Sequence, residues 1–260
     1  MDASLFHPQC IVEDDHLIAV VKPAGLATAN AARGVPSMFT VLQHTLPADG
    51  FLGVVSRLDA PVSGVLVMAK TRSAAAELSR QFRERLVEKS YEAVVEGRFP
   101  APLGQWIDWH DRIERRGEER RSRLRPAGAA PGRGLRREPC DGDDNCDDNG
   151  ENDDVSGGDC HVRARVVKRL GEVSLVELVP STGRRHQLRA QLSGRGCPIV
   201  GDRVYGSRLP FPATPGLGAA IALHARRLAF VHPGTQQAVV LEAAWPQVWH
   251  ARFRGLVTRK

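Results

Sequence analysis

Residues 56–71 read SRLDAPVSGVLVMAKT, a polar turn that runs directly into a continuous apolar stretch. The apolar residues 65–69 are bounded by turn residues and are typical of a short strand buried on both faces. Beyond them, Leu78, Phe82 and Leu86 recur every four residues behind Ser73, which predicts an amphipathic helix over residues 73–87. The stretch therefore indicates a turn, a buried strand and a covering helix, in that order.

Short apolar runs separated by turns continue along the chain. Residues 17–21 (LIAVV) predict a second buried strand, closed by the tight-turn sequence KPAG at residues 22–25. Further strands are predicted over residues 91–95, 173–179 and 238–241, and a short helix over residues 187–192. Because strands and helices do not alternate regularly, we predict an α+β fold with a mixed, mostly antiparallel central sheet and flanking helices.

The composition is that of a globular protein. The chain has 260 residues, of which 42% are hydrophobic and 25% charged, and no apolar run approaches the length of a membrane helix. The first residues do not have the pattern of a signal peptide. Five cysteines at irregular spacing do not indicate a disulfide framework, so we expect a protein of the reducing cytoplasm.

Residues 112–159 differ sharply from the rest of the sequence. Ten arginines and three glutamates lie in residues 112–137, and ten acids without a single lysine or arginine lie in residues 138–159. So few apolar residues cannot offset the entropy of ordering such a segment. We therefore predict one domain over residues 1–260 that is interrupted by a flexible charged insertion at about residues 112–159. The chain carries a net charge of +6 and this segment −3, so the remainder carries +9, which favours an anionic partner.

A second polar cluster lies in residues 181–189, STGRRHQLR, with three arginines, a histidine and a glutamine in six positions. Taken alone, this cluster is typical of a solvated helix start with a basic face. In the same way, Asp59 alone is typical of a turn-capping residue, with Arg57 as its ion-pair partner at the surface.

Together and in this order, the motifs resemble those of the RluA-type pseudouridine synthases. The resemblance is carried by four strings: SRLDAPVSGVLVMAKT, KSYEAVVEG, STGRRHQLRAQLSGRGCPIVGDRVYG and LHARRLAFVHP. The upstream VVKPAGLAT is similar to the opening strand and turn of that family. The resemblance covers essentially residues 11–110 and 161–245, so only the predicted insertion falls outside it.

The resemblance implies isomerisation of uridine to pseudouridine in RNA, in a central catalytic cleft and without a metal or cofactor. Asp59 matches the catalytic aspartate, which acts either as a nucleophile or as the base that removes a sugar proton. Arg184 matches the arginine expected beside Asp59, where it would hold the carboxylate as an anion. Tyr91 matches the tyrosine expected under the flipped base, where its phenol would help in removal of the proton on carbon 5.

The expected partner is ribosomal or transfer RNA, bound by a monomer. Arg57 matches the position that fills the space left by the flipped base. The remaining expected RNA contacts are Lys22, His186, Gln187 and Arg189.

Two departures from the family strings leave the expected catalytic groups in place. Ser56 stands where the family usually has histidine, and Arg185 where it usually has threonine. Two rival functions remain: a non-catalytic RNA-binding or ribosome-assembly protein of the same fold, and a glycosidase that releases free uracil. Neither the spacing of Cys140, Cys146 and Cys160 nor the acidic residues 145–156 make a strong metal motif.

Overall fold

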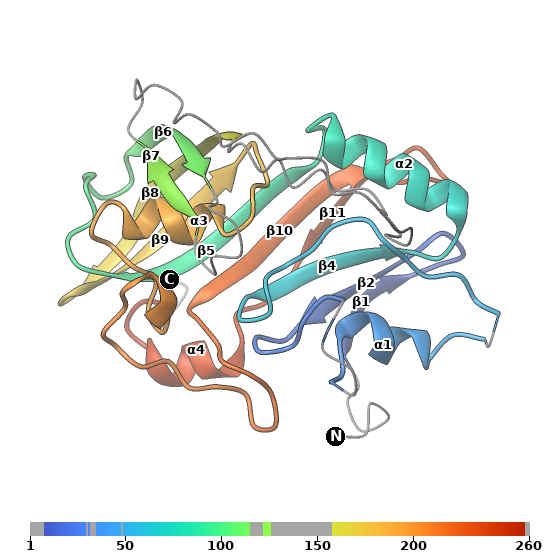
Figure 1. Ribbon diagram of the computed structural model, residues 1–260, viewed down its shortest axis with the longest axis horizontal. Coiled ribbons are helices and arrows are strands. Elements are labelled where there is room, and N and C mark those ends of the chain that lie inside the picture. The colour runs from blue at the N-terminus through green and yellow to red at the C-terminus, as the bar shows by residue number, and fades with distance from the viewer. Residues whose placement is uncertain are drawn as a thin grey trace, which may run out of the picture.

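The computed structural model describes residues 8–29, 31, 35–47, 49–114, 122–125 and 158–257. Within these ranges, eleven strands form one sheet in the order β1-β2-β4-β10-β5-β9-β8-β6-β7, with β11 beside β10 and β3 beside β4 (Figure 1). Among the described strand pairs only β4 and β10 run parallel. The predicted α+β fold with a mixed, mostly antiparallel sheet is confirmed.

The strands are β1 (Gln9–Glu13), β2 (Leu17–Lys22), β3 (Gly53–Val54), β4 (Ser63–Ala69), β5 (Glu88–Glu96), β6 (Trp106–Glu114), β7 (Arg123–Arg125), β8 (Gly158–Leu170), β9 (Val173–Pro180), β10 (Leu223–Val231) and β11 (Ala238–Glu242). The helices are α1 (Met38–Gln43), α2 (Arg72–Arg83), α3 (Gln187–Ser193), α4 (Gln247–Arg252) and the 3-10 turn η2 (Arg203–Tyr205). In the described part of the chain, no helix is long and apolar enough to cross a membrane.

Strands β2 and β4 are apolar throughout because helices cover both of their faces. Leu17 of β2 packs in one cluster with Leu78 of α2, whereas the next residue, Ile18, packs in another cluster with Met38 of α1. Successive side chains of a strand point to opposite faces, so each face of β2 has its own helix. This arrangement explains the uninterrupted apolar runs that the sequence shows at residues 17–21 and 65–69.

Helix α2 begins and ends earlier than predicted. Its N-cap is Thr71, whose side chain accepts a hydrogen bond from the N–H of Ala74, and not Ser73. The helix ends at Arg83, and Arg85 takes a left-handed conformation with φ of 60°. Leu86 therefore falls outside the helix and is exposed instead of joining the apolar face.

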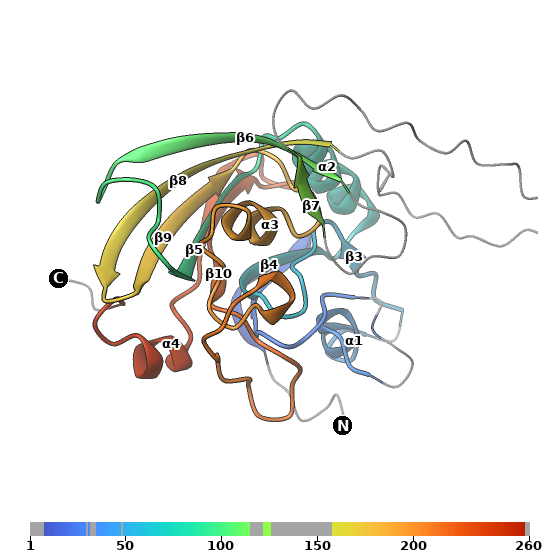
Figure 2. The same ribbon diagram turned by 60° about the vertical axis from the view of Figure 1, so that its left-hand side comes forward.

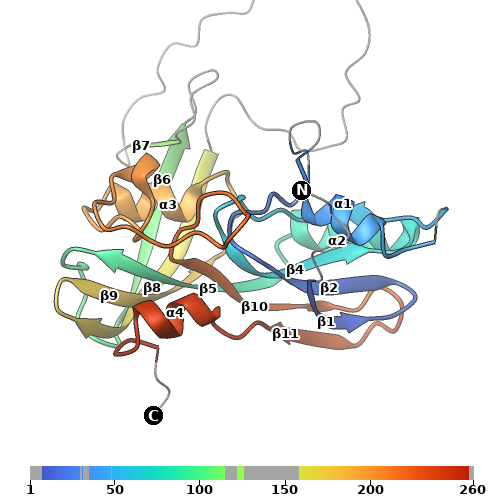
Figure 3. The same ribbon diagram turned by 90° about the horizontal axis from the view of Figure 1, so that it is seen from below.

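Helix α3 lies on the concave side of the curved strands β6, β8 and β9 (Figure 2). Leu188 and Leu192 of this helix are buried in the main apolar cluster, together with residues of β5, β8 and β9. Helix α4 packs Trp249 into the same cluster near the C-terminal end of the described chain (Figure 3). The polar residues at the start of α3 are thereby held over the sheet.

The parallel contact between β4 and β10 requires a glycine. Gly64 has φ of +125°, and a side chain there would meet the backbone nitrogen and oxygen of Ala225. Glycine supplies both the positive φ and the close approach. The turn that carries Asp59 is thereby brought against β10.

The predicted insertion lies mostly outside the described residues. Its described parts belong to the sheet: β6 extends to Glu114, β7 covers residues 123–125, and β8 starts at Gly158. β7 pairs with β6 at Ile113 and Leu124, and β6 pairs with β8 at Ile113 and Gly158. These residues are held by backbone pairing and by the partly buried Leu124, and the rest of the predicted insertion lies outside the described residues.

A buried histidine predicts acid sensitivity of the fold. His224 of β10 is fully buried, with Nδ1 2.8 Å from Ser63 Oγ, and burial lowers its pKa to about 4. Because an unfolded histidine has a pKa near 6.5, the unfolded chain takes up the proton first as the pH falls. We expect the free energy of unfolding, measured in urea, to decline by roughly 3 kcal/mol from this residue between pH 6.5 and 4. A free energy that stays constant across this range would contradict the assignment of a neutral buried imidazole.

Candidate active site

The turn that carries Asp59 is fixed through the backbone on both of its sides. On one side, Thr28 Oγ1 donates to the carbonyl of Leu58 at 2.8 Å and accepts from its N–H at 3.1 Å. On the other side, the carbonyl of Ala60 accepts from Lys22 Nζ at 3.2 Å and from the N–H of Gly25 at 2.8 Å. The carboxylate between them is 27% exposed, so it is held in place yet open to a ligand.

Arg189 joins two carboxylates through its guanidinium. Its Nε and Nη2 donate to the two oxygens of Asp202 at 2.7 and 2.9 Å, and its Nη1 donates to Asp59 Oδ2 at 3.1 Å. The side chain is 6% exposed and that of Asp202 is 1% exposed. A planar guanidinium suits this bridge because its donors form a rigid fork.

The charge on Arg189 is secured by its partners. Burial alone lowers the pKa of Arg189, but the hydrogen bonds and negative charge of Asp202, followed by those of Asp59, outweigh it and raise the pKa. The ring of Tyr205 adds a cation–π contact, 4.9 Å from the guanidinium carbon to the ring centroid. A permanent cation therefore lies against the carboxylate of Asp59.

Arg184, which the motif comparison placed beside Asp59, lies elsewhere. It is exposed, and its guanidinium lies so close to Gly158 that a side chain at Gly158 would collide with it. Asp59 has its hydrogen bond from Arg189, five residues further along, so the expected pairing with Arg184 is wrong. The left-handed His186 (φ 55°, ψ 20°) separates the two arginines and turns the chain into α3, which directs Arg189 inward.

His186 lies next to the carboxylate. Its Nε2 is 3.6 Å from Asp59 Oδ2, and its Nδ1 is 3.1 Å from the hydroxyl of Tyr205. Burial and the nearby charges of Arg189 and Arg185 lower the pKa of His186, and the charge of Asp59 opposes them. A left-handed conformation at a non-glycine residue is uncommon and tends to occur at functional sites.

Tyr91 lies on β5, where the charge of Asp59 acts on its phenol. It packs against the main apolar cluster, and burial together with the negative charge of Asp59 raises its pKa to about 12. Lys89 lies two positions earlier on the same face of β5, with Nζ 3.4 Å from the carbonyl of Thr182. Burial and the charge of Arg85 lower the pKa of Lys89. The side chain of Lys89 therefore lies where β5 meets the 181–186 loop.

Two of the expected RNA contacts are structural residues. Lys22 is fully buried and donates from Nζ to three backbone carbonyls, those of Pro23, Leu26 and Ala60. Burial lowers its pKa to about 7, against the opposing charge of Asp59.

Gln187 is buried as well. Its Oε1 accepts from Thr182 Oγ1 at 2.8 Å and from the N–H of Arg184 at 3.1 Å, and its Nε2 donates to the carbonyl of His161 at 3.1 Å. Neither side chain can reach RNA, because each is enclosed and bonded to the loop that it supports. Arg189, also expected to bind RNA, is enclosed in the same way.

Arg57 remains at the surface, in the segment that leads to Asp59, as its expected role requires. The residues that sequence reasoning missed are Asp202 and Tyr205. Both belong to the GDRVYG string at residues 201–206, which is part of the family resemblance. That string was the available signal: its acid and its aromatic residue follow Cys197 by five and eight positions. Neither position shows from its local sequence that it faces Arg189.

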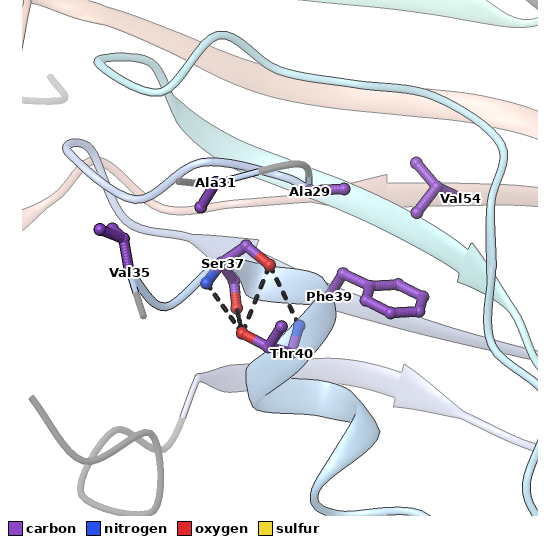
Figure 4. A pocket seen from close by; sticks show the side chains of 7 residues that line it. All are labelled: Ala29, Ala31, Val35, Ser37, Phe39, Thr40 and Val54. Atoms are coloured by element: carbon purple, nitrogen blue, oxygen red, sulfur yellow. Dashed lines mark hydrogen bonds between the residues drawn. The ribbon is translucent and has the colours of Figure 1, made fainter. Parts of the chain in front are cut away.

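Two of the pockets on the described surface bear on the location of the site. One, of about 340 Å³, lies beside the Arg189–Asp202 pair and is lined by both residues and by Pro61, Phe211 and Ile221. The other, of about 320 Å³, lies by the start of α1, where Ser37 and Thr40 close a capping box (Figure 4). Among the described residues that line it there is no charged side chain, whereas the first pocket adjoins groups that can do acid–base chemistry.

The two arginines make a direct test of this geometry. We expect Arg189→Lys to lower the free energy of unfolding by about 2 kcal/mol or more, because an ammonium cannot make the three bonds to two carboxylates. Arg184→Lys, at an exposed position, serves as the matched control and should change it by less than about 0.5 kcal/mol. Urea unfolding at pH 7 measures both, and equal effects would show that Arg189 does not bridge the carboxylates.

Comparison with known proteins finds relatives over most of the chain. The sequence profile of the RNA pseudouridylate synthase family matches residues 16–194. The chain is 30% identical over 240 residues to the dual-specificity RNA pseudouridine synthase RluA of Haemophilus influenzae, covering 90% of this chain and 91% of that protein. It is 31% identical over 235 residues to the ribosomal large subunit pseudouridine synthase C of Vibrio vulnificus.

The alignment with the Vibrio vulnificus protein covers 90% of this chain but only 64% of that protein's length. Among solved structures, human RNA pseudouridylate synthase domain containing 4 shares the fold, with a TM-score of 0.68, 23% identity and coverage of 95% of this chain and 93% of that one. The family match spans most of the sheet and both polar clusters. The chain therefore belongs to the RNA pseudouridylate synthase family and is of the RluA type.

Proposed function

We propose that this protein is an RNA pseudouridine synthase and that Asp59 carries the isomerisation. The observation that carries the proposal is the position of Asp59: a part-exposed carboxylate on a fixed turn, bonded to the buried guanidinium of Arg189. Membership of the family supports the reaction class. The position and hydrogen bonding of Asp59 support its choice as the catalytic residue.

The reaction requires no net oxidation or reduction. The bond between N1 of uracil and C1′ of ribose breaks, the ring turns, and a new bond forms between C5 and C1′. C5 then loses its proton while N1 gains one, so atoms and electrons balance within one nucleotide. A carboxylate, a neutral acid–base group and a dry site suffice for these steps.

Asp59 serves this chemistry in either of two ways. It attacks the sugar or the ring as a nucleophile, or it takes a proton from the sugar to give a glycal. Both routes begin from the ionised carboxylate, to which the guanidinium of Arg189 donates a charge-assisted hydrogen bond. The hydrogen bond also fixes which oxygen faces the open side.

Tyr91 acts in its neutral form. With a pKa of about 12, its phenol stays protonated at neutral pH, so it does not work as a preformed phenolate base. Its ring can support the face of the flipped uracil, and its O–H can relay the proton that leaves C5 once another group accepts it. Asp59, whose negative charge acts on Tyr91, is a candidate for that acceptor.

RNA reaches the site from the basic surface. Arg57 and Arg184 are exposed on the two segments that carry the catalytic turn and the 181–186 loop, and Arg185 is exposed beside them. A uridine in folded RNA must leave its stack at a cost of a few kcal/mol. We propose that Arg57 fills the space left behind and that Arg184 and Arg185 contact the phosphates.

The substrate is ribosomal or transfer RNA. Relatives named for the ribosomal large subunit support ribosomal RNA, and one named for dual specificity leaves room for a second class. We further propose a monomeric enzyme of the cytoplasm, and the free thiols of Cys10, Cys160 and Cys197 suit that reducing compartment. Pseudouridine mapping of total RNA from cells with and without the gene identifies the target uridine.

The two rival functions are weaker. A non-catalytic RNA-binding protein has no need of a carboxylate held between a buried arginine and open space. A glycosidase would use the same carboxylate but release uracil, and nothing in the geometry favours a water over C5 as the group that captures C1′.

Substitution of the carboxylate tests the proposal. We expect purified protein to form pseudouridine in ribosomal or transfer RNA, and Asp59→Asn to lower the rate at least about 1,000-fold because the neutral amide neither attacks nor takes a proton. Asp108→Asn, at an exposed position on β6, is the control and should keep the wild-type rate. Nucleoside analysis after digestion measures the product. Undiminished turnover by Asp59→Asn, or free uracil as the main product, would refute the proposal.

The pKa of Tyr91 predicts the shape of the pH profile. Because the phenol ionises only near pH 12, we expect the single-turnover rate to show no limb from this residue between pH 8 and 10. Tyr91→Phe should lower the rate by about 100-fold or more while leaving the profile unchanged in that range. A limb near pH 10 that disappears in Tyr91→Phe would instead indicate an exposed tyrosine that works as phenolate.

A further inference from the structure

Ser122, from the segment that interrupts the family pattern, reaches the active site. It is 6% exposed, and its backbone N–H donates to the hydroxyl of Tyr205 at 2.8 Å. Its own hydroxyl donates to the carbonyl of Arg185 at 3.0 Å, the residue before His186. An element outside the family pattern thus touches two residues around the catalytic carboxylate.

Apolar packing holds Ser122 in this position. The next strand, β7, pairs with β6 through Leu124 and Ile113. Leu124 packs against the buried cluster that contains Ile113, Cys160, Ala190 and Tyr205. It also lies so close to Gly194 that a side chain at this position would displace the end of the Leu124 side chain. The contact of Ser122 with Tyr205 is therefore part of a packed interface with α3.

The hydroxyl of Tyr205 has two hydrogen-bonding neighbours, and only one assignment of donors and acceptors satisfies both. A backbone N–H can only donate, so the Tyr205 oxygen accepts from Ser122. The single hydroxyl proton then remains for the other neighbour, His186 Nδ1, at 3.1 Å. If Nδ1 itself carried a proton, the hydroxyl would receive two donors and its own proton would have no acceptor among these groups. The proton of the neutral imidazole therefore belongs on Nε2, which faces Asp59 Oδ2 at 3.6 Å.

We propose that Ser122 is a positioning residue: its N–H orients the Tyr205 hydroxyl, which keeps His186 neutral with its proton on the nitrogen that faces Asp59. The proposal rests on the proposed role of Asp59 for its catalytic meaning, but the hydrogen-bond state of His186 can be measured separately. It gives the segment before β7 a defined task in the site.

The groups that face His186 are consistent with this state. Asp59, Asp202, Arg189, Arg185 and Tyr205 surround it, and burial has the largest effect, lowering the pKa of His186. An imidazolium would pair with Asp59 and compete with Arg189 for its oxygens. A neutral ring offers Asp59, or a substrate hydroxyl lying beside it, a single N–H donor and leaves the ion pair with Arg189 undisturbed.

Two matched variants separate the backbone donor from the side chain. Ser122→Pro removes the N–H, whereas Ser122→Ala keeps it and removes only the hydroxyl. The full-length protein, labelled with ¹⁵N-histidine, is studied by NMR, which distinguishes a protonated ring nitrogen from a bare one. The signals of His186 are assigned by their loss in His186→Gln.

We expect the wild type and Ser122→Ala to carry the proton of His186 on Nε2. Ser122→Pro and Tyr205→Phe should show a mixture of both tautomers and a His186 titration shifted to higher pH. In the activity assay, Ser122→Pro should lower kcat at least about tenfold with little change in KM for RNA, since the ring is misoriented while the RNA surface is kept. A wild-type His186 with its proton on Nδ1 overturns the proposal.

An excision variant covers the case in which Ser122→Pro does not fold. Because Ile113 pairs with Gly158, residues 114–157 can be replaced by a two-residue Asn-Gly turn between β6 and β8. We expect the same His186 signature as in Ser122→Pro. An unchanged His186 spectrum and titration in the excised protein also overturns the proposal. If the wild-type protein makes no pseudouridine but the spectra behave as expected, the proposed function fails while the hydrogen-bond relay stands.

Discussion

The bridge made by Arg189 between Asp202 and Asp59 is the interaction on which the site depends. A guanidinium that is 6% exposed needs a counter-charge, and the fully buried Asp202 supplies it through two hydrogen bonds. Those two bonds use one edge of the fork, so the remaining Nη1 is aimed at Asp59. A buried ion pair thus fixes the direction of a third bond to a carboxylate that stays part-exposed. The orientation of Asp59 therefore depends on the Arg189–Asp202 pair.

The fold supports both ends of this bridge. Asp59 lies in a turn before β4, a strand buried on both faces, and the turn is bonded through Thr28 and the buried Lys22. Arg189 lies in the first turn of α3, a helix held by Leu188 and Leu192 against the curved strands. The loop before α3 is held in turn by Gln187, whose amide bonds to Thr182, Arg184 and His161. Lys22 and Gln187, which were expected to bind RNA, therefore stabilise the turn and the loop that form the candidate site.

Sequence reasoning predicted the parts of the fold that depend on local pattern. The strands at residues 17–21 and 65–69 were predictable because two-sided burial leaves a continuous apolar run, and the helix at residues 187–192 because of its spacing and the glycine that follows. The choice between Arg184 and Arg189 was not predictable, since it depends on the left-handed His186 that redirects the chain between them. The burial of Lys22 depends on three carbonyls, one of them 38 residues away, and nothing in its own motif shows them. In the same way, composition predicted flexibility at Ser122 and Leu124, but pairing with β6 and contact with α3 order them.

The central claim, that Arg189 and not Arg184 holds the catalytic carboxylate, is tested most directly by two double-mutant cycles on the free energy of unfolding. One cycle combines Asp59→Ala with Arg189→Met, the other Asp59→Ala with Arg184→Met, all measured in urea at the same pH and salt concentration. We predict a coupling energy of about 1 kcal/mol in the first cycle and one near zero in the second, because only residues in contact depart from additivity. Coupling to Arg184 with none to Arg189 would contradict the account.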